Sequence, residues 1–398
     1  MKLPETFAGA TFDSRAVKPG MLFIALKGEK ADGHDFIPQA LAAGASGIID
    51  GYDELAEAAR AYRRTLAAKV IGVTGSAGKT TAKEMLRAFL SRIGKTHATD
   101  KNYNNHIGLP QTILNCPRDA EFLVVEMGTN HPGEIAALCD IAEPDAGLVT
   151  SIGTAHLEFF RTQENIALEK GELLRRAREF AVVSSECDQL ETLRRLRPSG
   201  LAVVDPDVKW IEDALSENLP GAHNVSNAAL AFAMAAHYGL SREDAADALR
   251  GLVLPGQRWK VLAVGGATIV NDAYNANPSS MSVALDTFAQ KYSGRRIAVL
   301  GDMFELGEAS ERLHRGIGAK VGGMLAKGEL DLLLAVGEQS CNWMAGEAEK
   351  FADARQICRV ADAAGAKAAL SSLLREGDCA LLKASRGMKL ESAIPEMQ

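Results

Sequence analysis

Short apolar runs alternate with amphipathic stretches along most of the chain, starting with VIGV at 70–73 and FLVV at 122–125. The stretches between the runs place apolar residues three and four positions apart, which is the spacing of a helix with one buried face. Such alternation is typical of parallel strands covered by helices on both faces, so the sequence predicts an α/β fold. Further apolar runs occupy residues 147–152, 181–184, 267–272, 295–302, 330–337 and 379–387.

The alternation divides into three segments. The first contains apolar runs at 21–26 and 47–50 and an expected helix around 35–44, punctuated by glycines. Near Pro255 and Gly256 the pattern is interrupted and then restarts, which indicates a linker. We therefore expect three α/β domains, because 398 residues exceed the usual size of one hydrophobic core. Their predicted bounds are 1–68, 69–256 and 257–398.

Composition limits the possible functions. A hydrophobic content of 47% with 24% charged residues is ordinary for a globular protein, and no apolar run reaches the ~20 residues of a membrane span. The start of the chain has no apolar signal core, and the six cysteines form no CxxC pair, so we expect a cytoplasmic protein with reduced, buried thiols. The formal charge of −7 gives no reason to expect nucleic acid as a partner.

The stretch VIGVTGSAGKTT at 70–81 combines an apolar run, a glycine-rich turn and the start of a helix. Glycines let consecutive amides face a phosphate, Lys79 can bridge the β- and γ-phosphates, and the Thr80 hydroxyl can ligate Mg²⁺. The strict phosphate-loop pattern needs glycine at position 73, where this chain has Val73. The alternative is a chance glycine-rich turn, which the strand context, the lysine and the two threonines make the weaker interpretation.

Two polar residues follow later apolar runs. Glu126 ends the run at 122–125, and His156 follows the run at 147–152 and a glycine turn. Because carboxyl ends of parallel strands face the ligand crevice, both are candidate metal ligands beside the phosphate loop. The alternatives are a solvated glutamate at a strand end and a surface or core histidine.

Lys170 lies on the apolar face of a predicted helix. Thr162 can cap this helix, and Lys170 is four residues from both Ile166 and Leu174. Such a lysine commonly extends its amine to solvent. The alternative is a desolvated amine with a lowered pKa, which can react with CO₂ to form a carbamate, an anionic oxygen ligand for a second metal ion.

Ten motifs in order along nearly the whole chain resemble those of the Mur ligases, most closely the branch that adds a dipeptide. YNANPSSM, NHPGEI and GDMFELG are distinctive in combination. The motifs are DSRAVKPGMLFIALKGEKADGHDFI at 13–37, GVTGSAGKTTAKEML at 72–86, NYNNHIGLP at 102–110, VVEMGTNHPGEI at 124–135, AHLEFF through EKGEL at 155–173, GAHNVSNAALA at 221–231, PGQRW at 255–259, NDAYNANPSSM at 271–281, VLGDMFELG at 299–307 and KASRG at 383–387.

The resemblance implies a three-domain architecture with a central phosphate-loop domain and a C-terminal Rossmann-like domain. It also implies an ATP-dependent, ADP-forming ligase of peptidoglycan precursor synthesis. This enzyme would join D-alanyl-D-alanine to UDP-N-acetylmuramoyl-tripeptide through an acyl phosphate, using two Mg²⁺ ions, and we expect a monomer.

The resemblance also implies roles for individual residues. Arg258 and Asp272 would approach the γ-phosphate on domain closure, with a hinge near 254–258. Lys79, Lys170, His156, Arg258 and Asp272 would be catalytic. ATP would contact Gly75, Ser76, Ala77, Gly78, Lys79, Thr80, Thr81, Asn224, Asn227, Asn275 and Asn277. Metal ligands would be Thr80, Glu126, His156 and Lys170 as N6-carboxylysine. Ser14 and Arg15 would serve the uridine nucleotide, Asn105 and His106 the sugar nucleotide, and Lys383, Ser385 and Arg386 the dipeptide.

Local structure alone offers another explanation for part of this set, because Asn277 can cap a helix that starts at Pro278. The chain also departs from the family. The interval from Val203 to Gly221 is short, and the segment before Val70 is trimmed, which bears on the uridine site. Three rival functions are considered. The first is another ligase of the superfamily, which adds a single amino acid to the same nucleotide precursor or is a folylpolyglutamate synthetase. The second is a nucleotide-binding or scaffold protein that has lost catalysis, and the third is a dinucleotide-dependent oxidoreductase. The last is disfavoured because no GxGxxG follows a strand.

Overall fold

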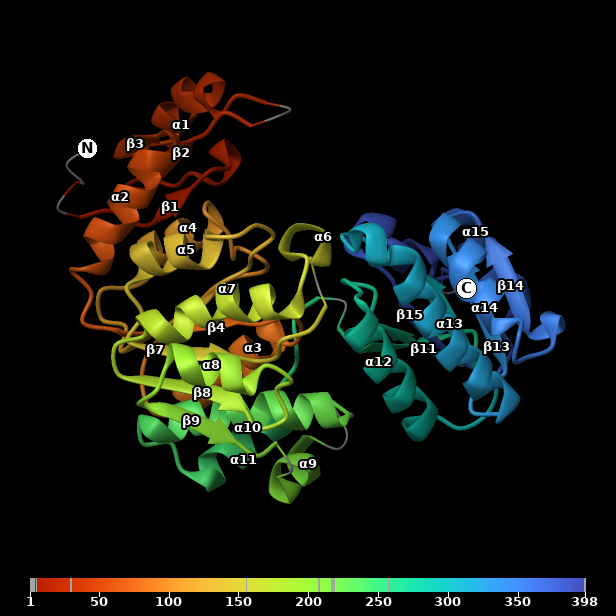
Figure 1. Cartoon of the computed structure of the whole chain (residues 1–398). Helices are drawn as coiled ribbons and strands as arrows, with labels where there is room; N and C mark the ends of the chain where they lie inside the picture. The colour runs from red at the N-terminus through yellow and green to blue at the C-terminus, as the bar shows by residue number, and fades with distance from the viewer. Residues whose placement is uncertain are drawn as a thin grey trace. The chain divides into compact units, whose positions relative to one another are not determined.

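Strands of the described residues form three β-sheets (Figure 1). The computed structural model describes residues 4, 6–28, 31–154, 156–206, 208–215, 219–256 and 258–396. Contacts divide them into two units. The larger unit comprises the described parts of 1–152, 164–214 and 225–252, and the smaller unit those of 153–163, 215–224 and 253–398. The predicted domain bounds stay predictions, and Gln257, where the third was placed, lies outside the described residues.

The larger unit begins with a small parallel sheet in the order β1-β2-β3. Asp50 precedes α2, whose first turn carries the acidic residues Asp53 and Glu54, as the positive end of a helix dipole favours. The elements are β1 (Ala10–Thr11), β2 (Leu22–Ala25), α1 (Ile37–Ala42), β3 (Gly47–Asp50) and α2 (Gly51–Arg63).

The second sheet of this unit has six strands in the order β5-β6-β4-β7-β8-β9, and every pair is parallel. The carboxyl ends of β4, β6 and β7 therefore lie next to one another at the same end of the sheet, where a ligand crevice is expected. The strands are β4 (Lys69–Thr74), β5 (Thr96–Ala98), β6 (Phe122–Glu126), β7 (Ala146–Val149), β8 (Phe180–Ser184) and β9 (Leu201–Val204). The helices are α3 (Lys79–Leu90), α4 (Gly108–Leu114), α5 (Glu134–Ala142), α7 (Gln163–Arg176), α8 (Leu190–Leu196), α9 (Lys209–Leu215), α10 (Ala222–His237) and α11 (Arg242–Arg250).

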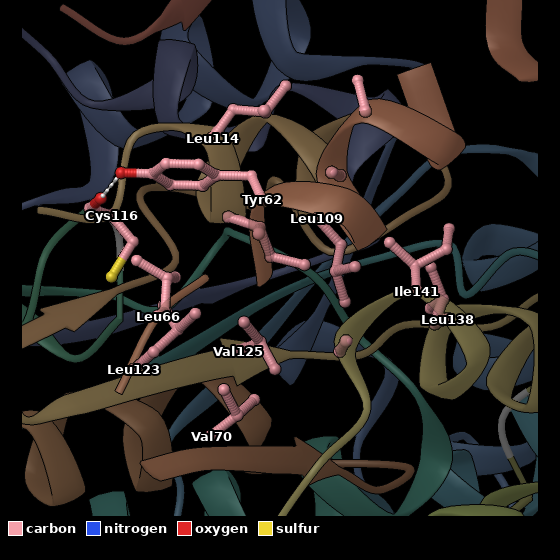
Figure 2. Packing of buried hydrophobic residues seen from close by; sticks show 14 of the residues in the cluster. Tyr62, Leu66, Val70, Leu109, Leu114, Cys116, Leu123, Val125, Leu138 and Ile141 are labelled. Carbon is pink, nitrogen blue, oxygen red and sulfur yellow. Dashed lines mark hydrogen bonds between the residues drawn. The ribbon is translucent and has the colours of Figure 1, made fainter. Parts of the chain in front are cut away.

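One hydrophobic cluster joins the two sheets of the larger unit. Tyr62 of α2 packs with Leu109 of α4 and Leu123 of β6, all buried. Figure 2 shows the Tyr62 ring among these residues, and its hydroxyl donates to the Cys116 carbonyl oxygen at 2.8 Å. A buried tyrosine needs such a partner for its hydroxyl, so this bond fixes α2 against the segment after α4.

The smaller unit contains the third sheet, in the order β10-β11-β15-β12-β13-β14. The β10–β11 pair is an antiparallel hairpin and the other pairs are parallel. The strands are β10 (Lys260–Val264), β11 (Ala267–Asn271), β12 (Arg296–Gly301), β13 (Leu332–Val336), β14 (Ile357–Val360) and β15 (Cys379–Lys383). The helices are α6 (Leu157–Phe160), α12 (Pro278–Lys291), α13 (Ser310–Ala326), α14 (Ala345–Ala348) and α15 (Ala363–Leu373).

The predicted α/β class with parallel sheets is confirmed, with differences of detail. All six cysteines are unpaired, but the expectation of buried thiols is wrong for Cys187, Cys341 and Cys358, which are only partly buried. No described helix has the length and apolar character to span a membrane.

Candidate functional site

The phosphate loop occupies residues 75–78, between the end of β4 and the start of α3. Gly75 and Gly78 both have positive φ angles, of 149° and 80°. A Cβ atom at Gly75 would lie 1.9 Å from Oγ1 of Thr150, and one at Gly78 would lie 2.4 Å from Oδ1 of Asn227. Glycine is therefore required at both positions, by backbone conformation and by close approach. Asn227, predicted to contact ATP, lies against this loop.

The loop is fastened to the residues that follow β7. The backbone N–H of Ser76 donates to the Ser151 carbonyl at 2.9 Å, and that of Ala77 donates to the Ser151 hydroxyl at 3.1 Å. The Thr150 hydroxyl donates back to the Ala77 carbonyl at 2.5 Å. Sequence reasoning did not single out Thr150 or Ser151, although two polar residues within the apolar run at 147–152 are a usable signal.

Lys79 and the two threonines begin α3. The Lys79 amine donates to the Gly75 carbonyl at 2.7 Å, so it lies over its own loop. Thr80 and Thr81 are buried in the first turn. The positive end of the helix dipole and the lysine charge make this turn suited to an anionic phosphate.

Glu126 ends β6 and is 1% exposed, so the interpretation as a solvated strand-end glutamate is wrong. Its Oε1 accepts a hydrogen bond from Nδ2 of Asn104 at 2.8 Å. Its Oε2 is buried and has no hydrogen-bond partner in the structure. An unpartnered oxygen of a buried carboxylate is costly for the fold but suited to a cation.

Lys170 lies on the buried face of α7 with an exposed fraction of 1%, so the interpretation in which its amine reaches solvent is wrong. Its Nζ is buried and has no hydrogen-bond partner in the part of the chain that the structure describes. Burial and, second, the charge of Lys79 hold the pKa of Lys170 well below its usual value, against the smaller opposing effects of Glu169 and Glu134. A lowered pKa favours the neutral, nucleophilic form of the amine.

The neighbouring Glu169 has a different environment, although it is also buried. Its carboxylate accepts from the backbone N–H groups of Gly133 at 2.7 Å and Ile135 at 2.8 Å, and from the Thr129 hydroxyl at 3.4 Å. Glu169 thus caps the start of α5 and leaves Lys170 without a partner. No local sequence signal predicts this, because the capped amides are 36 and 34 residues away.

His156 belongs to the smaller unit by its contacts. Its Nδ1 lies 2.6 Å from the carboxylate of Glu305, in the GDMFELG motif, and its φ is 61°. Among the described residues, no three His, Cys, Asp or Glu side chains cluster closely enough to hold a metal ion. Of the expected metal ligands that are His, Cys, Asp or Glu, Glu126 lies in the larger unit. The role of His156 as a metal ligand stays a prediction.

Predicted residues of the smaller unit gather at the carboxyl ends of β11 and β15. The Lys383 amine donates to Oδ2 of Asp272 at 2.5 Å and to the Asn275 carbonyl at 3.2 Å. Oδ1 of Asp272 accepts from the Trp259 N–H at 3.3 Å. Burial lowers the pKa of the nearby His223 to about 4, so this ring is neutral beside the ion pair.

The remaining residues of this unit are engaged locally. The Arg258 guanidinium lies 3.7 Å from the Tyr274 ring centroid, and Arg386 pairs with Glu391 at 2.7 Å. The Ser385 hydroxyl accepts from the Phe304 N–H at 2.8 Å. Asn277 caps α12 in a reciprocal capping box with Ser280, and Pro278 starts the helix, so the local interpretation of Asn277 and Pro278 is confirmed.

The predicted substrate residues of the larger unit are exposed or partly exposed. The Ser14 hydroxyl donates to Gln39 at 2.9 Å, and Arg15 pairs with its helix cap Asp13 at 2.9 Å. Oδ1 of Asn105 accepts from the N–H groups of Ile107 at 3.1 Å and of Gly108, the first residue of α4, at 3.0 Å. The His106 ring lies 5.3 Å from that of Tyr52. Asn224, predicted to contact ATP, lies at the start of α10 and belongs by its contacts to the smaller unit; it is buried and donates to the Pro220 carbonyl at 2.9 Å.

An open cavity of about 530 Å³ lies by the amino ends of β7 and β8, opposite the phosphate loop. Four arginines line it, and each donates to an oxygen atom of the protein. Helix capping and ion pairing therefore account for the arginines of this cavity. These contacts are Arg60 to the Asp140 carbonyl at 2.8 Å, Arg64 to Glu143 at 2.6 Å, Arg176 to Asp140 at 2.5 Å and Arg178 to Glu143 at 2.9 Å.

Models of known families match three stretches of the chain. The catalytic domain of the Mur ligase family matches residues 6–93, and the Mur ligase middle domain matches 73–205. The glutamate ligase domain of Mur ligases matches 257–386. Together the three matches span most of the sequence in the expected order.

Relatives and solved structures agree with these matches. The chain is 34% identical over 428 aligned residues to the UDP-N-acetylmuramoyl-tripeptide–D-alanyl-D-alanine ligase of Bacillus subtilis (strain 168), covering 98% of this chain and 93% of the relative. A crystal structure of MurF from Acinetobacter baumannii superposes with a TM-score of 0.83 at 29% identity, covering 98% and 94%. MurF from Thermotoga maritima in complex with ADP gives 0.77 at 31% identity, covering 97% and 96%.

Proposed function

Because the chain belongs to the Mur ligase family, we propose that it joins D-alanyl-D-alanine to UDP-N-acetylmuramoyl-tripeptide. The reaction is ATP-dependent and ADP-forming, and it is a step of peptidoglycan precursor synthesis. The observation that carries this function is the similarity over nearly the full length to ligases named for this reaction.

The reaction proceeds in two steps. A carboxylate of the tripeptide attacks the γ-phosphorus of ATP, so that an acyl phosphate forms and ADP leaves. The amine of the dipeptide then attacks the acyl carbon, the amide bond forms, and phosphate and a proton leave. Such phosphoryl transfer depends on positioning and charge stabilisation. The charge of Lys79 and the positive end of the α3 dipole serve this purpose at the start of α3.

The residues fit a magnesium site. Oε2 of Glu126 is a buried carboxylate oxygen without a partner, and the Thr80 hydroxyl stands in the first turn after the phosphate loop. Mg²⁺ when bound neutralises the phosphate and carboxylate oxygens that crowd together in the reaction. We assign Glu126 and Thr80 to hold it, and the resemblance adds His156 and a second ion.

Lys170 fits the proposed carbamate. A neutral amine attacks CO₂, an N–C bond forms, one proton leaves the nitrogen, and an anionic oxygen results. The buried Nζ without a partner and the lowered pKa of Lys170 favour this reaction. Lys170→Ala should lose ligase turnover, and short carboxylic acids should restore part of it by supplying the missing anion. Full activity of Lys170→Ala without added acid would contradict the carbamate.

The roles of the smaller unit's residues rest on the resemblance. Arg258, Asp272, Asn224, Asn275 and Asn277 are proposed for ATP. Lys383, Ser385 and Arg386 are proposed for the dipeptide, and in the larger unit Ser14, Arg15, Asn105 and His106 for the sugar nucleotide. A monomeric state and a cytoplasmic location are likewise proposals.

A phosphate-release assay tests the function. The enzyme is supplied with ATP, Mg²⁺ and UDP-N-acetylmuramoyl-tripeptide, and the amine is varied between D-alanyl-D-alanine and single amino acids. We expect release only with the dipeptide, and mass spectrometry should detect the pentapeptide product. Release with a single amino acid but not the dipeptide would move the chain to the rival branch. No release with any amine would favour a homologue without catalysis.

A further inference from the structure

The two oxygens of the Glu126 carboxylate differ in their hydrogen bonding. Oε1 accepts from the amide Nδ2 of Asn104 at 2.8 Å, whereas Oε2 is buried and has no hydrogen-bond partner among the described residues. A carboxylate that is fixed through one oxygen cannot rotate freely about its last side-chain bond. The unpartnered oxygen therefore keeps one direction.

Asn104 is itself fixed, although it lies between β5 and α4 rather than in a helix or strand. Its carbonyl oxygen accepts from the Gly128 N–H at 2.8 Å. Its side chain covers Gly128 so closely that a Cβ atom there would lie 2.9 Å from its Cγ. The segment that follows Glu126 thus holds Asn104, and Asn104 in turn holds Glu126.

A second contact fixes the backbone of Glu126. Its N–H donates to the Thr99 hydroxyl at 2.9 Å, and the Thr99 carbonyl accepts from the buried Lys83 amine at 2.6 Å. Lys83 belongs to α3, the helix of the phosphate loop. The backbone and the side chain of Glu126 are therefore fixed by separate residues, so a change at Asn104 leaves the backbone contact in place.

We propose that Asn104 is a positioning residue that turns Oε2 of Glu126 toward the cation. The inference rests on the proposed role of Glu126 as a metal ligand and adds the residue that orients it. Partners of metal ligands of this kind typically contribute about 10–100-fold to metal affinity. An amide suits this position because it donates to Oε1 without bringing a charge that competes for the metal.

The test measures metal binding directly, with Mn²⁺ in place of Mg²⁺ and electron paramagnetic resonance of the free ion as the readout. The full-length enzyme is titrated in the presence of ADP. Asn104→Leu keeps the approximate shape without the donor, Asn104→Ala replaces it if the leucine variant does not fold, and Asn102→Ala is the control in the same loop. We expect an increase of about 10–100-fold in the apparent Kd for Mn²⁺ in the Asn104 variants and none in the control.

The variant Glu126→Gln distinguishes a failure of the positioning role of Asn104 from a failure of the proposed metal role of Glu126. If Glu126→Gln weakens Mn²⁺ binding and the Asn104 variants bind as the wild type does, the positioning role is wrong and the metal role of Glu126 stands. If Glu126→Gln also binds Mn²⁺ as the wild type does, the metal role itself is wrong. Weaker binding in both, with an unchanged control, supports the inference.

Discussion

Two lysines of the larger unit are fully buried but differ in their partners, which allows a matched test of the site. Lys170 is 1% exposed, and its amine has no hydrogen-bond partner. Lys83 is 0% exposed, and its amine donates to Glu84 and to the Thr99 carbonyl. Lys170→Met should therefore stabilise the unit, while Lys83→Met should destabilise it.

The magnitudes follow from the contacts. Burying a neutral polar group without a partner costs about 1–3 kcal/mol, and methionine fills the space of a lysine stem with little repacking, so Lys170→Met should gain about 1–2 kcal/mol. Removing one member of a buried ion pair costs about 3–5 kcal/mol. The cost of Lys83→Met should lie at the lower end of this range, about 3 kcal/mol, because Glu84 keeps its ion pair with Arg87 at 2.8 Å.

The pH dependence has a definite sign. Burial holds the pKa of Lys170 well below the usual 10.5, so in that interval the unfolded chain binds a proton that the folded chain does not. Wild-type stability should therefore rise with pH from the lowered folded pKa up to about 10.5. Lys170→Met lacks this dependence, and its advantage over the wild type should be larger at pH 7 than at pH 10.

Differential scanning calorimetry in CO₂-depleted buffer measures the effect, since a carbamate on the wild-type lysine would change the comparison. A gain of 1–2 kcal/mol corresponds to a rise in melting temperature of about 2–8 °C for a unit of this size. The same Lys170→Met variant should lose ligase turnover by a factor on the order of 10²–10³. Lower melting temperatures for Lys170→Met than for wild type at both pH values would refute the reasoning from the unpartnered amine.

Three further substitutions test the surroundings of the site. Gly78→Ala should raise the Kd for ADP about tenfold or more in calorimetric titration, because its positive φ and the 2.4 Å approach to Asn227 exclude a Cβ atom. Glu169→Gln should lower the free energy of unfolding in urea by about 1–3 kcal/mol, since the amide end brings a donor toward the α5 amides. Arg63→Met should cost about 3 kcal/mol by the same measurement, because the buried carboxylate of Asp145 loses its 2.9 Å partner but keeps Arg178 at 3.5 Å. Unchanged values in any of these would contradict the corresponding contact.

The sequence predicted those features that depend on residues close together along the chain. The phosphate loop follows from its glycines and the strand before it, and the inward position of Lys170 follows from its four-residue spacing to Ile166 and Leu174. The cap at Asn277 likewise follows from Asn277 and the adjacent Pro278. In each case the residues that decide the structure lie within one or two helical turns.

The missed features depend on distant partners or on weak apolar signals. The fastening of Ala77 to Ser151 joins residues 74 positions apart, and no spacing rule covers such a distance. β14 (Ile357–Val360) was missed because it is a short edge strand with an exposed arginine, Arg359. Edge strands bury less surface and carry less of the apolar pattern on which sequence prediction relies.

The contrast between two buried carboxylates indicates that the site is specific rather than a packing defect. Both oxygens of Glu169 are satisfied, by amides of a helix that begins more than thirty residues earlier in the chain. Glu126, equally buried in the same unit, has one oxygen satisfied and one left without a partner. The fold is thus able to satisfy a buried carboxylate completely, and leaving one incomplete carries a real cost in free energy. A buried polar atom without a hydrogen-bond partner is expected where a ligand supplies that partner. This contrast supports the proposal that a cation is the missing partner of Oε2 of Glu126.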